Sequence, residues 1–280
     1  MNAGIDERLI RDVVSEVLGR LGGSPPSAPP AGGNRLPAST VSAVSANAGA
    51  RGRFGVYQDA NDACAAAHEA FLQLREKGVE ARRQIVDIVK GMADAKAVEW
   101  GRIELEETQI GRPDHKVEKL QIIKLVPGVE WIRPDGLSGD HGITLEEYTP
   151  FGVIGAITPM THSIPTLSGN IVNMVAAGNA VVFNAHPSAA RCAAVAVRAY
   201  NEAIYREVGI ENIACIVEQP SLDSFKAICS HEAVRLLCVT GGPAVVKAAM
   251  QTGKRAICAG PGNPPVLVDD TACMKRAAQA

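Results

Sequence analysis

The chain has 280 residues, 46% of them hydrophobic, so it can bury a large core in one or two domains. A net charge of −2 and a pI near 6.3 argue against a nucleic-acid-binding protein, which would carry a clustered basic face. No apolar run reaches the roughly 20 residues of a membrane-spanning helix, which argues against an integral membrane protein. Seven scattered cysteines without a Cys-x-x-Cys pair indicate reduced thiols in a cytoplasmic protein, with neither a disulfide framework nor a metal site.

The first 21 residues predict an amphipathic helix that stands apart from the rest of the chain. Its apolar side chains recur at three-, four- and five-residue steps and form one stripe, while charged side chains occupy the other side. Residues 22–53 are rich in Pro, Ala, Gly and Ser and are expected to be a disordered linker. A helix on such a tether either folds back on its own domain or docks on another protein. The length of the tether favours docking.

The remainder, residues 54–280, is expected to be one α/β domain. Two or three helices are predicted between 56 and 109, and a more extended stretch over 117–148. From residue 151 onwards, apolar runs of five to seven residues alternate with helical patterns, which indicates parallel strands covered on both faces. The sequence therefore predicts a doubly wound, mostly parallel sheet that binds ligands at the carboxyl ends of its strands. The expected strands are 151–157, 179–184, 213–218, 234–240 and 255–259.

The end of the chain suggests a fragment of a longer protein. Asp269, Asp270 and Thr271 are typical of a helix N-cap, and a helix is expected from residue 272 onwards. That pattern reaches Ala280 without a stop signal.

Four turns at strand ends are candidates for a ligand site. No G-x-G-x-x-G follows the first strand of the sheet, so the usual dinucleotide motif is absent. The turns are instead "ITPMTHSIPT" (157–166), "FNAHPSA" (183–189), "CVTGGPAVV" (238–246) and "CAGPGNPP" (258–265). Gly241 and Gly242 precede a helix, so free backbone N–H groups and the helix dipole there suit an anion such as a pyrophosphate.

The motifs "VIGAITPMTHSIPT", "GNAVVFNAHPSA", "LLCVTGG" and "GPGNPPVLVDDTA" closely resemble CoA-acylating aldehyde dehydrogenases of bacterial microcompartments, the propionaldehyde- and acetaldehyde-oxidising branch of the aldehyde dehydrogenase superfamily. The resemblance runs from about residue 55 to 280 and implies a Rossmann-like nucleotide-binding domain. It also implies that residues 1–21 are an encapsulation peptide for a shell protein, that the enzyme is a homo-oligomer, and that it works in the cytoplasm inside a microcompartment.

The resemblance implies a reaction in which a cysteine thiolate attacks a short-chain aldehyde, hydride passes to NAD⁺ and the acyl group passes to coenzyme A. Cys258 stands where hydrolytic members have a glutamate base, so water is not activated and Cys258 is a small packing residue. The nucleophile is expected beyond Ala280, which leaves this chain inactive by itself. Two alternatives remain open: a non-catalytic nucleotide-binding scaffold, and a hydrolytic dehydrogenase that releases free acid.

The same resemblance assigns roles to individual residues. Thr161 or His162 falls at the position of the oxyanion-holding asparagine, and Asn184 replaces a lysine that contacts the adenosine ribose. The implied cofactor-binding residues are Thr158, Pro159, Met160, Asn184, His186, Pro187, Thr240, Gly241, Gly242 and Gly260.

Deleting residues 1–21 should abolish co-purification with microcompartment shells, because the apolar stripe that docks on the shell protein is lost. The soluble activity of the full-length enzyme should not change, since the segment lies outside the expected nucleotide-binding domain. Co-sedimentation with purified shells measures the effect, and shell association equal to that of the undeleted protein would refute the docking role.

Overall fold

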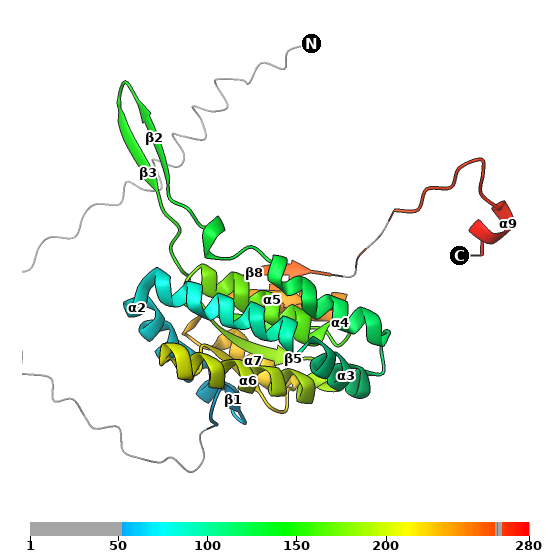
Figure 1. Ribbon diagram of the computed structural model, residues 1–280, viewed down its shortest axis with the longest axis horizontal. Helices are drawn as coiled ribbons and strands as arrows, with labels where there is room; N and C mark the ends of the chain where they lie inside the picture. Colours follow the sequence, from blue (N-terminus) through cyan, green and yellow to red (C-terminus); the bar gives the residue numbers. More distant parts are fainter. Residues whose placement is uncertain (1–51, 261, 263–264, 280) are drawn as a thin grey trace, which may run out of the picture. The chain divides into compact units, whose positions relative to one another are not determined.

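The computed structural model of the chain describes residues 52–260, 262 and 265–279. The expected helix over 1–21 and nearly all of the expected linker over 22–53 lie outside these residues. The described part is built on one six-stranded, all-parallel sheet with the order β1-β6-β5-β4-β7-β8 (Figure 1). The strands are β1 (Val56–Tyr57), β4 (Val153–Thr158), β5 (Ala180–Ala185), β6 (Ala214–Val217), β7 (Val234–Thr240) and β8 (Arg255–Ala259).

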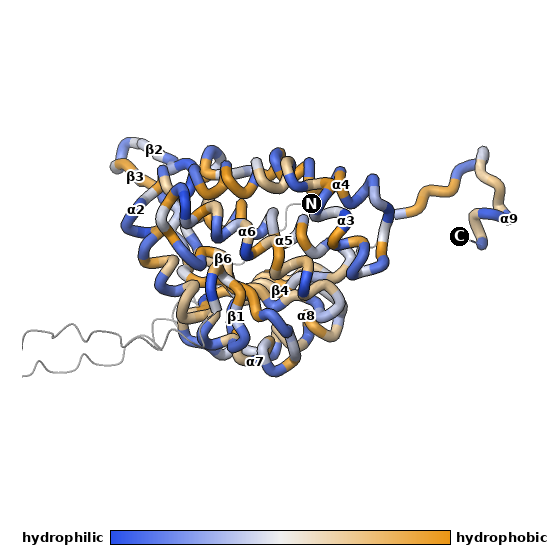
Figure 2. The backbone as a smooth tube through the Cα atoms, turned by 60° about the horizontal axis from the view of Figure 1, so that its bottom comes forward, coloured by the Kyte–Doolittle hydropathy of each residue, from blue (hydrophilic) through white to orange (hydrophobic). Residues whose placement is uncertain are grey.

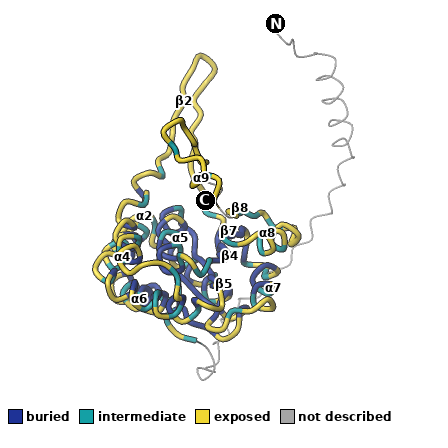
Figure 3. The backbone as a smooth tube through the Cα atoms, turned by 90° about the vertical axis from the view of Figure 1, so that its right-hand side faces the viewer, coloured by how far each residue is buried: buried dark blue, intermediate teal, exposed yellow. Residues whose placement is uncertain are grey.

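Helices cover both faces of the sheet, as the doubly wound prediction requires (Figures 2 and 3). One face carries α5 (Ser163–Ala176) and α6 (Ala190–Val208), with α3 (Ala97–Thr108), α4 (Pro113–Gln121) and part of α2 (Ala60–Ala95) packed over them. The backbone of α2 is kinked at Gly78, and another part of this helix packs directly against β5, β6 and α7. The opposite face carries α7 (Leu222–Ser230) and α8 (Pro243–Met250). Among the described residues, no helix combines the length and the apolar character needed to cross a membrane.

The strands at the centre of the sheet are buried along their whole length, which explains their continuous apolar sequences. Every residue of β4, β5 and β6 is buried. Gly155 in β4 has no side chain because α7 lies directly over it. A Cβ atom there would lie 2.9 Å from a methyl carbon of Ile228 and 3.0 Å from one of Leu237. The glycine therefore allows α7 to pack close to the sheet.

Two segments differ from the sequence-based expectations. The stretch over 117–148 is extended only in its second half, because α4 continues to Gln121 and two 3₁₀ turns follow, at Ile122–Leu125 and Val129–Trp131. The antiparallel hairpin of β2 (Asp135–Gly139) and β3 (Gly142–Glu146) comes next. The final helix, α9 (Met274–Ala277), begins two residues later than expected, because the Asp269 side chain accepts from the N–H of Thr271 and closes a separate turn.

The side chain of Asn179 forms hydrogen bonds that connect the end of α5 with the segment just before β4. Its side chain is 2% exposed, and its Oδ1 accepts from the N–H groups of Phe151 (2.7 Å) and Gly152 (3.1 Å). Its Nδ2 donates to the carbonyl of Met174 at 3.1 Å. One buried amide thus satisfies three backbone groups at the amino edge of the sheet, where water does not reach.

Asn179→Ala should lower the free energy of unfolding by roughly 2–4 kcal/mol, because it removes the acceptor of the Phe151 and Gly152 N–H groups. Asn173→Ala is the matched control: Asn173 is exposed on α5, and its loss should change stability by no more than about 0.5 kcal/mol. Urea denaturation of both variants measures the difference. Equal stabilities would contradict the role given to Asn179.

Candidate functional site

The strand order reverses at β4, and this reversal creates a crevice. From β4 the chain proceeds through β5 to β6 on one side, then returns to place β7 and β8 on the other side. The connections that leave β4 and β7 run in opposite directions and open a space at the carboxyl edge, where ligands bind in sheets of this kind. A cavity of about 420 Å³ lies there, between the ends of β4, β5 and β7 and the first turns of α7 and α8.

Ten of the twelve predicted site residues line this one cavity. They are Thr158, Pro159, Met160, Thr161, Asn184, His186, Pro187, Thr240, Gly241 and Gly242. Three of the four predicted turns therefore meet. The exceptions are His162, which lies just behind the wall, and Gly260, which borders a separate groove with Pro243 and Met250 on α8. Sequence reasoning missed the lining residues Ser221, Leu222 and Phe225 at the start of α7, because no glycine-rich turn precedes them. On α8, Ala244 and Val245 lie within the candidate turn 238–246 but were not singled out, and Ala248 lies one turn further along the helix.

The cavity is mainly apolar, with a few polar atoms that are ready to bind a ligand. Phe225 from α7 and Val245 and Ala248 from α8 form facing apolar walls, which suit a flat ring such as adenine. The Thr158 hydroxyl lies at the end of β4, is 2% exposed and has no hydrogen-bond partner. A buried hydroxyl without a partner is costly, so a polar ligand atom at this position would be stabilised.

The start of α8 offers fewer N–H groups than its glycines suggest. The N–H of Gly241 donates to the carbonyl of Ala259 at 3.1 Å, and Pro243 has no N–H. The N–H of Val245 donates back to the Gly242 carbonyl at 3.1 Å. Within the described residues this leaves the N–H groups of Gly242 and Ala244 for an anion, with the helix dipole behind them. The expectation for Gly241 must be corrected: its contribution is the missing side chain.

Asn184 and His186 both use their side chains to build the neighbouring elements. Oδ1 of Asn184 accepts from the Ser224 hydroxyl at 2.6 Å, and Ser224 forms a reciprocal capping box with Ser221 at the start of α7. Nδ1 of His186 accepts from the N–H of Ser188 at 3.1 Å, so it caps the 3₁₀ turn Pro187–Ala189. The Asn184 amide therefore fixes the position of α7 at the cavity.

His162 lies at the N-cap position of α5 without donating or accepting a cap bond. The side chain is half-buried, and Nδ1 is buried without a partner. Burial, followed by the nearby charges of Lys119 and Lys116, lowers its pKa to about 4. The imidazole is therefore neutral near pH 7 and keeps one N–H donor. Thr161, the other predicted oxyanion donor, is exposed at the cavity rim.

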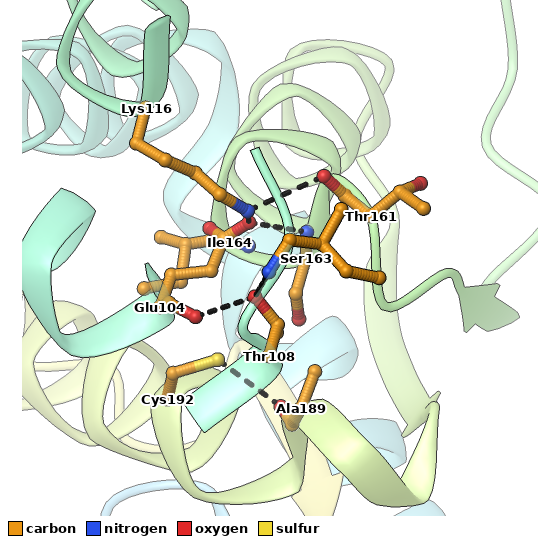
Figure 4. A network of polar contacts seen from close by, with 9 residues as sticks. Glu104, Thr108, Lys116, Thr161, Ser163, Ile164, Ala189 and Cys192 are labelled. Atoms are coloured by element: carbon orange, nitrogen blue, oxygen red, sulfur yellow. Dashed lines mark hydrogen bonds and ion pairs between the residues drawn. The ribbon is translucent and has the colours of Figure 1, made fainter. Parts of the chain in front are cut away.

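A buried ion pair supports the wall of the cavity from behind (Figure 4). Glu104 of α3 is fully buried and pairs with Lys116 of α4. The Glu104 carboxylate also accepts from the N–H groups of Ser163 (3.2 Å) and Ile164 (3.1 Å). Sequence reasoning missed the pair, because both residues stand among many surface charges and nothing in their spacing marks them as buried.

None of the seven cysteines lines the cavity. Burial raises the pKa of Cys64 to about 12 and that of Cys229 to about 11, and it also raises the pKa values of Cys192, Cys215 and Cys238. A nucleophile needs the opposite shift, so these thiols are packing residues. Cys258 lies on β8, half-buried and away from the cavity. In the described part of the chain, no cluster of His, Cys, Asp or Glu side chains is suited to a metal ion.

A cavity at the switch point of a parallel sheet covered on both faces defines the class of doubly wound α/β ligand-binding domains. The model of the aldehyde dehydrogenase family matches residues 38–280, and the chain belongs to this family.

Comparison with curated relatives and solved structures shows which members of the family this chain resembles. The acetaldehyde dehydrogenase (acetylating) of Bilophila wadsworthia is 36% identical over 97% of this chain and 54% of its own length. The propionaldehyde dehydrogenase of Rhodopseudomonas palustris, solved with bound CoA and an acylated cysteine, has 41% identity and a TM-score of 0.75 over 80% of this chain and 52% of that one. The propionaldehyde dehydrogenase of the Clostridium phytofermentans fucose utilisation microcompartment has 45% identity and a TM-score of 0.75 over the same shares. The chain thus spans about half the length of the relatives it matches.

The free energy of unfolding should decrease as the pH is lowered from about 6.5 to about 4, in part because of His162. In this range the unfolded chain binds a proton that the folded site excludes, since the folded pKa is about 4. His162→Gln should remove this contribution and flatten the dependence of the free energy of unfolding on pH. His141→Gln, in the exposed turn between β2 and β3, is the control and should keep the wild-type slope. Urea denaturation at several pH values measures the slope. A slope in His162→Gln equal to that of the wild type would show that His162 does not contribute to the pH dependence of stability.

Proposed function

We propose that this chain is the nucleotide-binding part of a CoA-acylating aldehyde dehydrogenase that oxidises a short-chain aldehyde, propionaldehyde or acetaldehyde, to its acyl-CoA with NAD⁺. The observation that carries the proposal is the convergence of three strand ends on one apolar cavity that also holds an unpartnered Thr158 hydroxyl. The relatives support the choice of reaction, since they act on these two aldehydes and one of them holds CoA.

The residues of the cavity fit a nucleotide in three places. The apolar walls of α7 and α8 take the adenine ring of NAD⁺ or of coenzyme A, and the N–H groups of Gly242 and Ala244 take a phosphate oxygen. The Thr158–Thr161 turn faces the reactive end, with the Thr158 hydroxyl as its hydrogen-bonding group. Bound NAD⁺ supplies the hydride acceptor, and coenzyme A supplies the thiol that receives the acyl group. Because no lysine or arginine lines the cavity, the adenosine ribose is held without a long cation. This favours exchange of one nucleotide for the other.

Transfer to coenzyme A, in preference to hydrolysis, agrees with the side chains present. No aspartate or glutamate lines the cavity. Cys258, on β8, occupies the position where hydrolytic members of the family carry their base. Without a carboxylate to accept a proton from water, an enzyme-bound thioester lasts until a thiol arrives. The nucleophilic cysteine itself is proposed to lie outside these 280 residues.

Thr161, at the cavity rim, and His162, the next residue in the chain, are the two proposed oxyanion donors. An uncharged His162 ring keeps one N–H for the developing negative charge, and the low pKa keeps the ring uncharged. For the surroundings of the enzyme, we propose a cytoplasmic microcompartment, with residues 1–21 as the segment that contacts the shell and with self-association into a homo-oligomer. The microcompartment origin of the Clostridium phytofermentans relative supports this setting.

The protein joined to its proposed catalytic part should form NADH from propionaldehyde or acetaldehyde beyond a single turnover only when coenzyme A is present, and acyl-CoA should be the main product. Absorbance at the NADH band and mass spectrometry of the product measure both. Dominant release of free acid would favour the hydrolytic alternative, and NAD⁺ binding without any turnover would favour the scaffold.

A substitution at Gly241 tests whether NAD⁺ binds in the cavity. In Gly241→Val, a side chain at the cavity wall should weaken NAD⁺ binding by roughly ten- to a hundredfold, the loss expected for one hydrogen bond to a charged group. The variant should still fold, because a Cβ at Gly241 approaches only Val245, at 3.7 Å. Gly91→Val on exposed α2, where a Cβ meets nothing within 4 Å, is the matched control. Calorimetry with NAD⁺ compares the two.

A further inference from the structure

The ion pair of Glu104 and Lys116 lies next to the cavity without lining it. The two residues are 0% and 2% exposed, so both charges have been removed from water. Such a pair offsets its desolvation cost only when further hydrogen bonds complete it. Here every further hydrogen bond of the two charged groups goes to one short segment, residues 161–164.

The hydrogen bonds from Lys116 and Glu104 reach both the carbonyl and the N–H groups of this segment. The Lys116 ammonium donates to the carbonyl of Thr161 at 3.3 Å, while the Glu104 carboxylate accepts the N–H groups of Ser163 and Ile164, the first two residues of α5. The N-cap residue His162 makes no side-chain cap bond, so Glu104 supplies from another helix the acceptor that α5 lacks. Figure 4 shows the carboxylate and the ammonium directed at this backbone.

The segment that these hydrogen bonds hold, residues 161–164, directly follows the cavity wall in the chain. Thr158, Pro159, Met160 and Thr161 line the cavity, and Thr161 is also the residue that Lys116 holds. A shift of the Thr161 carbonyl therefore moves the turn that faces a ligand.

The sequence lets α4 come close enough to place Lys116 here. Gly101 lies in the interior of α3, where glycine is unfavourable for a helix. A Cβ at this position would lie 3.3 Å from the Cβ of Lys116 and 3.3 Å from the backbone nitrogen of Val117, so any larger residue would push α4 away. Close helix packing and the ion pair thus depend on the same glycine.

We propose that Glu104 and Lys116 are positioning residues, which hold the Thr158–Thr161 turn in the place that a bound nucleotide requires. The inference rests on the proposed function, since the nucleotide is the ligand proposed for this cavity. Neither residue touches that ligand, and their effect passes through the backbone of residues 161–164.

The test compares two substitutions on the same pair of helices. Lys116→Met removes the ammonium and keeps the length of the side chain. Glu107→Gln is the control: Glu107, also on α3, accepts the N–H groups of Arg191 (2.9 Å) and Cys192 (2.6 Å) at the start of α6, and not those of residues 161–164. Lys116→Met should raise the Kd for NAD⁺ by about tenfold at a temperature where circular dichroism shows the protein folded. Glu107→Gln should lower the melting temperature and keep the Kd within about twofold of wild type.

A readout that needs no ligand accompanies the binding measurement. Amide hydrogen exchange over residues 158–166 should become faster in Lys116→Met and stay unchanged in Glu107→Gln. Gly101→Ala, which keeps both charges but displaces α4, should show a smaller change in the same direction and serves if Lys116→Met does not fold.

An unchanged Kd in a folded but destabilised Lys116→Met would show that the pair only adds stability, and would overturn the inference. If the wild-type protein binds neither NAD⁺ nor coenzyme A, the proposed function fails instead. Hydrogen exchange then decides: faster exchange confined to residues 158–166 supports the positioning role, and unchanged exchange refutes it.

Discussion

The pairing of β4 with both β5 and β7 determines where this domain can bind a ligand. Because all three strands are parallel, their carboxyl ends lie at one edge, and the chain must leave that edge in opposite directions. The helices that follow β4 and β5, α5 and α6, lie on one face, whereas α8, which follows β7, lies on the other face with α7. The cavity lies between these strand ends and the first turns of α7 and α8. The cavity results from this topology, while its chemistry comes from the short turns that end at Thr161, Pro187 and Gly242.

Two carboxylates on α3 stabilise the helices on the first of these faces. Glu104 and Glu107 are three residues apart, so they lie on one side of α3, and each accepts two backbone N–H groups at the start of another helix. The beginnings of α5 and α6 carry partial positive charge, which makes a negative side chain favourable at both. The two sites differ in burial, since Glu104 is fully enclosed and needs Lys116 as a counter-ion, whereas Glu107 is half-exposed. A helix outside the sheet layer thereby fixes the start of α5, which directly follows the cavity wall.

The sequence predicted the part of the fold that rests on local patterns and missed the part that rests on distant contacts. Buried parallel strands have apolar runs, so the strands from β4 to β8 were found to within two residues, and the fold class followed from them. The two residues of β1 exist only through pairing with Ile216 and Val217, about 160 positions away, and no local pattern marks them. Strand-end turns located the cavity. The partners of the Asn184 amide and the burial of Lys116 depend on helix packing, which a single sequence does not show.

In the proposed reaction, the described residues supply the binding of the nucleotide and do not supply the nucleophile. A cavity without carboxylates or thiols can hold a nucleotide but supplies neither a carboxylate base for water nor a thiol that attacks an aldehyde. Burial raises the pKa values of the thiols inside the domain, Cys64, Cys192, Cys215 and Cys229, and so suppresses their reactivity. An acyl group carried by an external thiolate would therefore meet no competing thiol among the residues that line the cavity. The same absence that makes the domain unreactive by itself protects a thioester until coenzyme A enters, so in the proposed reaction the domain contributes selectivity for the acceptor as well as binding of the nucleotide.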